Sequence, residues 1–301
     1  MSKQPVKGFS AITSTYFLQN AILFLNLTKN RDKQKMPFHD TSNTIMYYEI
    51  FEPNFTAMPL SSQENTLLLI HGFGGTPESD FEAQLPVLQS HFRVVAPHLH
   101  GYGRSTHRNT YNITFYRDDA SDLATLLDSL NIDKTLVLGF SDGGIVGLLL
   151  AALYPQRVSA LAVMGAQPTI NAQNVAAIRH WLIETPLPED WQKELAKLHG
   201  EPYWRSLPRM YVEGQEKLVA AGGIIITEEE LASIRCPALI MHGKRDRIVP
   251  VDYAHIISER IPNSQIRLFD AGHAAHRRCE KEYTSAIMEF FLDQQGRKEP
   301  Q

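Results

Sequence analysis

The stretch Gly139-Phe140-Ser141-Asp142-Gly143-Gly144 decides how this chain folds. It follows the apolar run 136–138 and precedes the apolar stretch 145–153, so its serine lies where a strand turns into a helix. In such a tight corner the residues two before and two after the serine must be small, and the strain lifts the hydroxyl out of the sheet. The two flanking glycines meet this demand, which indicates a nucleophile elbow. Because Gly-x-Ser-x-Gly also arises by chance, the interpretation depends on the rest of the chain.

Short apolar runs alternate with helical patterns on both sides of this corner. Six runs are typical of strands, and several are apolar on both faces: 66–70, 92–96, 135–138, 158–164, 238–241 and 266–269. Helical patterns are expected between them, notably over 115–130 and 280–292. Strands that alternate with helices predict an α/β fold with a mostly parallel, doubly wound sheet and right-handed crossovers.

The alternation breaks over about residues 166–226, where the pattern is helical and no clear strand is expected. We interpret this segment as a helical cap over the catalytic edge, with Gly222-Gly223 as a hinge near its end. Its aromatic rings are expected to line a pocket in part, although each ring could instead only pack the cap against the sheet. These rings are Trp181, Trp191, Trp204, Tyr203 and Tyr211.

Composition describes a globular protein with an unusual start. With 301 residues, of which 43% are apolar and 21% charged, the chain can bury one large core. A net charge of −4 gives no basic surface for nucleic acid. Residues 1–35 are basic and contain an apolar patch over 16–27, which is shorter than the roughly 20 residues that a membrane span needs. We therefore expect a basic N-terminal extension over 1–35, one domain over 36–301 and no transmembrane span.

The cysteines bear on the compartment. Cys236 and Cys279 form neither a metal pattern nor a disulfide framework, which favours a reducing compartment. Cytoplasm is the default expectation. The basic extension leaves targeting or association with a surface open.

Ser141 needs chemical partners, because a serine hydroxyl attacks only when a base removes its proton and a third group orients that base. Asp246 comes directly after the strand 238–241, and His273 follows the last strand, so both should reach the same sheet edge as Ser141. The prediction is a triad of these three residues.

Other residues compete for two of these roles. Asp246 could instead be a surface acid that pairs with a neighbouring arginine, and Asp252 and Glu230 are weaker candidates for the acid. His276 competes with His273 for the role of base, and the two also form an H-x-x-H pair. No third ligand with matching spacing accompanies that pair or the pair of His98 and His100, so we expect no metal site.

The tetrahedral intermediate of such a reaction needs backbone N–H groups aimed at its oxyanion. The stretch His71-Gly72-Phe73-Gly74-Gly75 follows a strand, and its glycines allow the backbone to approach a substrate. We assign the two donors to the amides of Phe73 and Asp142, the latter at the N-terminus of the helix after the elbow. His71 is expected to brace this loop.

The chain resembles the α/β-hydrolase superfamily over about residues 45–292. Five stretches carry the resemblance, in this order: residues 71–75, which we call the oxyanion loop, the turn Gly101-Tyr102-Gly103-Arg104-Ser105, the elbow, the Asp246 loop and Gly272-His273. The resemblance implies an α/β-hydrolase fold with a helical cap inserted after strand 6. It also implies hydrolysis of a small ester, amide or activated acyl compound through an acyl-serine intermediate, without a cofactor. The partner is then a small-molecule substrate.

Three stretches resemble the valacyclovirase (biphenyl hydrolase-like) branch of that superfamily: Ser141-Asp142-Gly143-Gly144, Leu198-His199-Gly200-Glu201-Pro202-Tyr203 and His273-Ala274-Ala275-His276. The pair Pro97-His98 departs from the pattern, since relatives usually carry an acid after the proline. This departure leaves the triad untouched but puts the local loop geometry in question.

Asp142 is the best local clue to the substrate. A carboxylate beside the nucleophile favours a cationic group such as the ammonium of an amino-acid ester, as the branch resemblance also implies. The other interpretation is that Asp142 only suits a helix N-terminus. Phe140 is the second predicted substrate-binding residue.

The main functional hypothesis is a serine esterase, with amino-acid esters among its possible substrates. A carbon–carbon bond hydrolase of ring-cleavage products would use the same three residues, and a non-enzymatic ligand receptor on a hydrolase scaffold is a third class. Dehalogenases and epoxide hydrolases are disfavoured because they carry Asp where this chain has Ser141. The sequence determines neither the substrate nor the oligomeric state.

Overall fold

The computed structural model describes residues 37–53 and 65–296. The sheet and its helices belong to the unit that begins at Phe38. The predicted extension over 1–35, with its apolar patch, lies outside the described residues.

The unit that begins at Phe38 is built on an eight-stranded sheet in the order β1-β2-β4-β3-β5-β6-β7-β8. From β3 to β8 neighbouring strands run parallel, whereas β2 runs antiparallel to both β1 and β4. This topology confirms the predicted fold class. The strands are β1 Phe38–Asp40, β2 Ile45–Phe51, β3 Thr66–Ile70, β4 Arg93–Pro97, β5 Thr135–Phe140, β6 Val158–Met164, β7 Ala238–Gly243 and β8 Ser264–Phe269.

The observed strands differ from the predicted ones in two ways, and backbone pairing between strands explains both. The strands β1 and β2 were not among the six predicted runs, and they join the sheet through antiparallel pairing with each other and with β4. The strand β8 begins at Ser264 rather than at residue 266, because Ser264 and Gln265 pair with the start of β7. Backbone pairing with a distant strand extends a strand beyond its apolar run.

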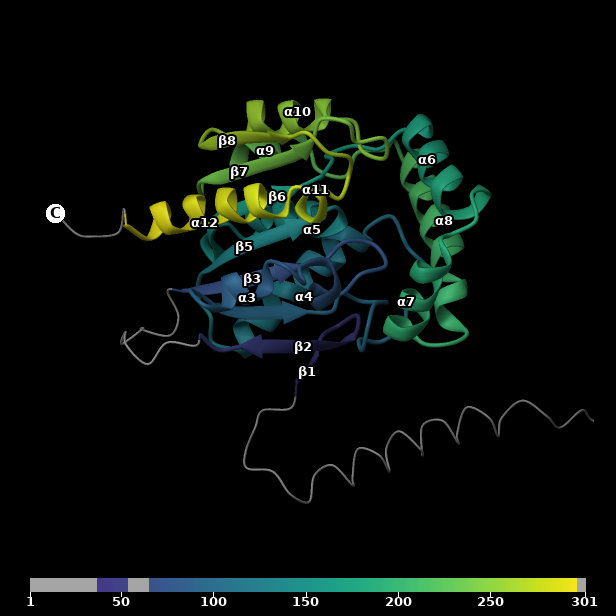
Figure 1. Ribbon diagram of the computed structural model, residues 1–301, viewed down its shortest axis with the longest axis horizontal. Helices are drawn as coiled ribbons and strands as arrows, with labels where there is room; N and C mark the ends of the chain where they lie inside the picture. The colour runs from purple at the N-terminus through teal and green to yellow at the C-terminus, as the bar shows by residue number, and fades with distance from the viewer. Residues whose placement is uncertain (1–36, 54–64, 297–301) are drawn as a thin grey trace, which may run out of the picture. The chain divides into compact units, whose positions relative to one another are not determined.

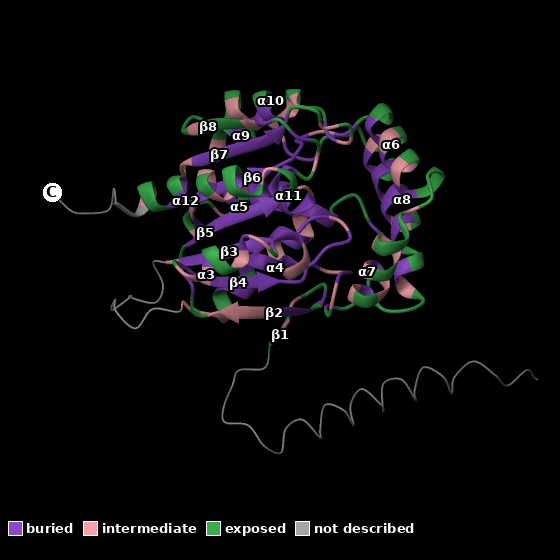
Figure 2. Ribbon diagram, in the orientation of Figure 1, coloured by how far each residue is buried: buried purple, intermediate pink, exposed green. Residues whose placement is uncertain are grey.

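Helices cover both faces of the sheet (Figure 2). The alternation of side chains along each strand divides the core into two clusters. Leu68 and Ile70 of β3 point into a cluster with α4 (Phe115–Ser129) and α5 (Asp142–Leu153), whereas Leu67 and Leu69 point into a cluster with α12 (Glu280–Gly296). The helices outside the cap are α2 Pro77–Asp80, α3 Leu85–Gln89, α4 Phe115–Ser129, α5 Asp142–Leu153, η1 Pro155–Arg157, α9 Glu228–Ser233, α10 Asp252–Arg260, α11 Ala275–Arg278 and α12 Glu280–Gly296. None of the helices within the described ranges combines the length and the apolar character needed to cross a bilayer.

The helical cap follows β6 and stands beside the carboxyl ends of the strands (Figure 1). Its two ends are paired, since the Ile170 amide donates to the Gly223 carbonyl at 2.7 Å. A Cβ on Gly223 would lie 2.1 Å from the Ile170 oxygen, and its φ is +73°. A close backbone approach therefore explains the glycine that the sequence suggested as a hinge. The cap helices are α6 Ala172–Arg179, η2 His180–Glu184, α7 Glu189–His199, η3 Tyr203–Arg205 and α8 Leu207–Ala220.

Candidate active site

Ser141 stands in a strained corner between β5 and α5. Its φ of 53° and ψ of −119° lie outside the conformations usual for a residue with a Cβ. A Cβ on Gly139 would lie 2.3 Å from the Gly143 carbonyl oxygen, and one on Gly143 would lie 2.2 Å from the Ile70 oxygen. The two glycines are thus required by backbone contact, and they leave the Ser141 hydroxyl free to project from the sheet edge.

The structure brings together the three residues of the predicted triad. His273 Nε2 lies 2.9 Å from Ser141 Oγ, and His273 Nδ1 lies 2.7 Å from Asp246 Oδ2. The three side chains come from the ends of β5, β7 and β8, which are far apart in sequence but share one sheet edge. A proton can pass from the hydroxyl to the imidazole without any rearrangement.

The carboxylate of Asp246 is fully buried and held by four groups. Its Oδ1 accepts hydrogen bonds from the amides of Ile248 and Val249 at 2.9 and 3.0 Å, while His242 Nε2 lies 3.3 Å from Oδ2, the oxygen that also meets His273. Burial alone would raise the pKa of Asp246, but the hydrogen bonds from His242 and His273 hold that pKa below its usual range. Asp246 is therefore ionised and can orient the imidazole.

His242 is a contact that the sequence reasoning missed. Its side chain is buried, and its Nε2 also lies 2.9 Å from the Val249 carbonyl oxygen. The only available signal was its place at the end of a strand, directly before the loop that carries Asp246.

The competing candidates lie elsewhere. His276 is buried among the rings of Phe81, Phe140 and Tyr283, where burial lowers its pKa to about 3.

The competing acids have other neighbours. Glu230 forms a bidentate ion pair with Arg117. Asp252 begins α10 and is not among the residues that line the cavity at Ser141. Arg245 pairs with Asp270 rather than with Asp246. Over the described ranges of the chain, no group of three His, Cys, Asp or Glu residues is arranged to hold a metal ion.

The loop that carries Phe73 is fixed by a hydrogen bond to Asp80, another residue that the sequence reasoning missed. Asp80 Oδ2 accepts a hydrogen bond from the Gly72 amide at 2.8 Å, and Arg277 donates to Oδ1 at 3.1 Å. Burial raises the pKa of Asp80 to about 6. His71 braces the same loop, since its Nδ1 lies 2.8 Å from the Gly72 oxygen and its Nε2 accepts from the Leu99 amide at 3.0 Å.

Asp142 is buried beside Ser141 and accepts hydrogen bonds from two tyrosine hydroxyls. Tyr116 and Tyr211 both donate to Oδ1 at 2.8 Å, which leaves Oδ2 without a donor among the described residues. Burial raises the pKa of Asp142 to about 6, although both hydroxyls act to lower it. The sequence predicted Tyr211 only as a cap ring that could line a pocket, and it did not predict the hydrogen bond of either tyrosine to Asp142, because the two come from α8 and α4.

A cavity of about 210 Å³ opens at this edge of the sheet. Its walls include Phe73, Phe140, Ser141, Asp142 and His273. The cap contributes Trp181 and Trp191, whose rings stack with centroids 5.2 Å apart, and Tyr211. Of the other predicted aromatic residues, Trp204 is buried outside this wall and Tyr203 stacks on His107. The rings of the cap thus divide between lining and packing.

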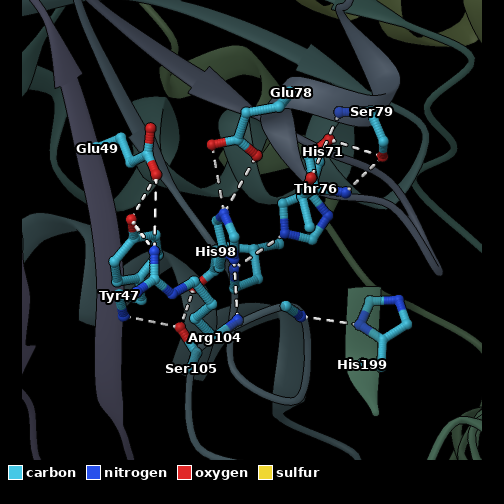
Figure 3. A network of polar contacts seen from close by, with 12 residues as sticks. Tyr47, Glu49, His71, Thr76, Glu78, Ser79, His98, Arg104, Ser105 and His199 are labelled. Carbon is cyan, nitrogen blue, oxygen red and sulfur yellow. Dashed lines mark hydrogen bonds and ion pairs between the residues drawn. The ribbon is translucent and has the colours of Figure 1, made fainter. Parts of the chain in front are cut away.

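Pro97-His98, where the chain departs from the pattern of its relatives, begins a loop whose backbone is held by the His98 ring. His98 Nδ1 accepts from the Arg104 amide at 3.0 Å, and its Nε2 lies 3.2 Å from Glu78 (Figure 3). Gly103 fits against the ring with φ +54°, since a Cβ there would lie 1.9 Å from His98 Nδ1. The histidine and Glu78 together order this turn beside the loop of residues 71–75.

Comparisons with known proteins identify the family to which the chain is similar. A family model described as "alpha/beta hydrolase fold" matches residues 65–196. The serine hydrolase BPHL of Homo sapiens is 30% identical over 230 residues, which cover 75% of this chain and 79% of that protein. The 2-hydroxy-6-oxo-2,4-heptadienoate hydrolase of Pseudomonas putida is 27% identical over 234 residues, covering 70% of this chain and 82% of that one.

A solved structure shares the fold at lower identity. It is that of 2-hydroxy-6-oxo-6-phenylhexa-2,4-dienoate hydrolase from a Rhodococcus species. It superposes with a TM-score of 0.71 and 20% identity, covering 85% of this chain and 98% of that one.

Proposed function

Since this chain belongs to the α/β-hydrolase family and is a hydrolase, we propose that it cleaves a small ester or related acyl compound through an acyl-serine intermediate. The observation that carries the proposal is the continuous line of hydrogen bonds from Ser141 through His273 to Asp246. The resemblance to BPHL, a serine hydrolase, supports the same chemistry.

In the proposed first step Ser141 Oγ attacks the carbonyl carbon of the substrate, and His273 Nε2 takes the hydroxyl proton. His273 then gives this proton to the leaving alcohol as the acyl-serine forms. A water molecule repeats the sequence on the acyl-serine, with His273 again as the base. Asp246 stays ionised throughout and stabilises the imidazolium through its bond to Nδ1.

We assign stabilisation of the tetrahedral intermediate to the amides of Phe73 and Asp142. Both residues line the cavity beside Ser141. The Asp142 amide stands at the N-terminus of α5, where the helix dipole favours a negative charge. A donor at such a position contributes roughly 3 to 4 kcal/mol to catalysis in comparable sites.

The substrate class that we favour is an ester with a cationic group, such as an amino-acid ester. Asp142 Oδ2 has no donor among the described residues and can accept a hydrogen bond from a substrate ammonium. The stacked pair of Trp181 and Trp191 and the ring of Phe140 offer an apolar wall for the rest of the molecule. Replacement of Asp142 by Asn is then expected to weaken turnover of α-amino esters more than that of neutral esters of the same size.

Labelling with a fluorophosphonate and a panel of p-nitrophenyl and aminoacyl esters test this function. Wild-type protein should be labelled and should hydrolyse the esters, whereas Ser141→Ala should do neither, with a loss in kcat of at least about 10⁴-fold. Folded wild-type protein that resists labelling would instead favour a ligand receptor on this scaffold.

Carbon–carbon bond hydrolysis is the second candidate, because the Pseudomonas putida relative is a dienoate hydrolase and Arg277 lines the cavity, where it could meet a substrate carboxylate. A dienoate ring-cleavage product assayed beside the ester panel separates the two activities. A higher kcat/KM for the dienoate would replace the ester proposal.

A cytoplasmic location also remains our proposal. Cys236 and Cys279 are both free thiols, as is usual in a reducing compartment. Fractionation of cells that express the full chain tests the location.

A further inference from the structure

We propose that His199, the last residue of α7 in the cap, is a positioning residue that fixes the oxyanion loop from the cap side. This inference rests on the proposed function, because it concerns the loop to which we assign the Phe73 donor. It adds a contribution of the cap to catalysis that is separate from lining the cavity.

The ring of His199 bridges two loops at the carboxyl edge of the sheet. Its Nδ1 accepts a hydrogen bond from the Gly103 amide at 2.8 Å, so that nitrogen carries no proton. The proton is then on Nε2, which lies 3.0 Å from the Gly74 carbonyl oxygen and donates to it. The side chain is buried, and burial lowers its pKa to about 4, so the ring is neutral at physiological pH.

One face of α7 also contacts Gly74. Trp191, Leu195 and His199 follow one another at intervals of four residues and therefore share a face of the helix. A Cβ on Gly74 would lie 3.2 Å from Leu195 Cδ2 and 3.6 Å from Trp191 Cζ2, and Gly74 has a φ of +74°. The helix and the loop are thus in direct contact next to Phe73.

The residues on either side of Phe73 are held by different parts of the fold. Gly72 is anchored from the sheet side by Asp80 and His71, whereas the Gly74 carbonyl is anchored by the cap through His199. Figure 3 draws His71, His98 and His199 within one polar network. The Phe73 N–H shares a rigid peptide plane with the Gly72 carbonyl, and the Gly74 carbonyl shares one with the Gly75 amide, which donates to that Gly72 oxygen at 3.3 Å. The direction of the Phe73 N–H therefore depends on both anchors. Loss of the cap anchor should loosen the donor without removing it.

Two substitutions separate the two hydrogen bonds of His199. In His199→Gln the side-chain amide nitrogen can take the place of Nε2 and keep the bond to Gly74. In His199→Asn the amide oxygen can take the place of Nδ1 and keep the bond to Gly103, but the bond to Gly74 is lost. Both variants remove the ring, so their difference reports the contact with the oxyanion loop.

The experiment measures kcat and KM with an ester. The concentration of active enzyme is determined by titrating Ser141 to completion with a fluorophosphonate, so unfolded protein does not lower the measured kcat. We expect H199N to lose about tenfold in kcat, less than the 10²–10³ that follows removal of a donor itself. Its KM should change less than twofold, and H199Q should stay within about threefold of wild type in kcat. A boronic acid, which mimics the tetrahedral intermediate, should bind H199N more weakly by the same factor as the loss in kcat.

Equal kcat in H199N and wild type, or equal losses in H199N and H199Q, would overturn the role of His199 while leaving the proposed function intact. A change in KM alone would also contradict it, since that result indicates binding of the substrate rather than of the intermediate. Wild-type protein that does not react with the fluorophosphonate would mean that the proposed function itself has failed.

Discussion

Two buried carboxylates near Ser141 differ in the donors that surround them. Asp246 receives two backbone amides and two histidines, and its pKa is held below the usual range. Asp142 receives only two phenol hydroxyls, both at one oxygen, and burial raises its pKa to about 6. Asp246 therefore stays charged in mildly acidic solution, whereas Asp142 can lose its charge there.

This difference predicts a pH-dependent selectivity. As the pH falls through about 6, Asp142 gains a proton and loses the negative charge that attracts an ammonium. The ratio of kcat/KM for an α-amino ester to that for a neutral ester of equal size should fall between pH 7 and pH 5, by up to about tenfold. Taking the ratio cancels every pH effect that the two esters share.

The control for this prediction is Asp142→Asn, whose amide can still accept from both tyrosines. Its ratio should be low and constant over the same pH range. A ratio in wild-type protein that does not change with pH would show that Asp142 does not face the substrate cation.

At the scale of single elements, two glycines of α5 face different neighbours. A Cβ on Gly143 would meet backbone, at 2.2 Å from the Ile70 oxygen and 2.5 Å from the His71 oxygen. A Cβ on Gly147 would meet only side-chain tips, with Val137 Cγ1 at 3.2 Å and Leu161 Cδ1 at 3.3 Å. Side-chain tips can move apart, but the backbone of β3 cannot.

We therefore expect Gly143→Ala to lower the free energy of unfolding by more than about 2 kcal/mol and to reduce kcat. Gly147→Ala should change that free energy by less than about 1 kcal/mol, because the gain in helix propensity offsets the tighter contact. Urea unfolding with matched ester assays measures both quantities. Equal stability of the two variants would contradict this account of the elbow.

The helix α4 carries one buried and one exposed ion pair. Arg108 and Asp119 pair with both side chains buried, and Arg108 also donates to the His100 carbonyl at 2.8 Å. Asp128 pairs with Arg157 at 2.7 Å, but the Asp128 side chain is 66% exposed. Removing the acid from the buried pair would leave a guanidinium charge in the core.

Asp119→Asn is accordingly expected to lower the free energy of unfolding by about 3 to 5 kcal/mol. Asp128→Asn, on the same helix, should lower it by less than about 1 kcal/mol. Chemical denaturation at low and high salt separates the two, since only the exposed pair should respond to ionic strength. A loss below 1 kcal/mol in Asp119→Asn would argue against a charged pair in the core.

At the scale of the whole molecule, we propose that residues 36–301 form the hydrolase domain, with the cap over about 166–226, and that residues 1–35 are an extension. The first strand begins at Phe38, and the residues that line the cavity begin at Phe73. A chain that starts at Met36 should then keep kcat and KM within about twofold of the full chain. Ester kinetics and thermal unfolding of both chains provide the check, and a large loss of activity on truncation would place part of the site in the extension.

The meeting of Ser141, Asp246 and His273 at one place was predictable, because each lies at or shortly after the end of a strand, and the carboxyl ends of parallel strands meet at one edge. Asp80, His199, Tyr116 and Tyr211 were not predictable in their roles, because their partners lie on elements far away in the sequence. The start of β8 shows the same limit, since it depends on pairing with β7 rather than on its own composition.

The sequence by itself determined the fold class, the elbow and the order of serine, acid and histidine, because these depend on local periodicity and on small residues at a tight corner. Only the tertiary structure decided which buried groups surround Asp142 and Asp246, and so which carboxylate keeps its charge. It also decided that α7 of the cap lies against the oxyanion loop. The physical reason is that burial and hydrogen bonding between distant segments set the energy of a charge or a peptide plane, and no local pattern encodes those neighbours.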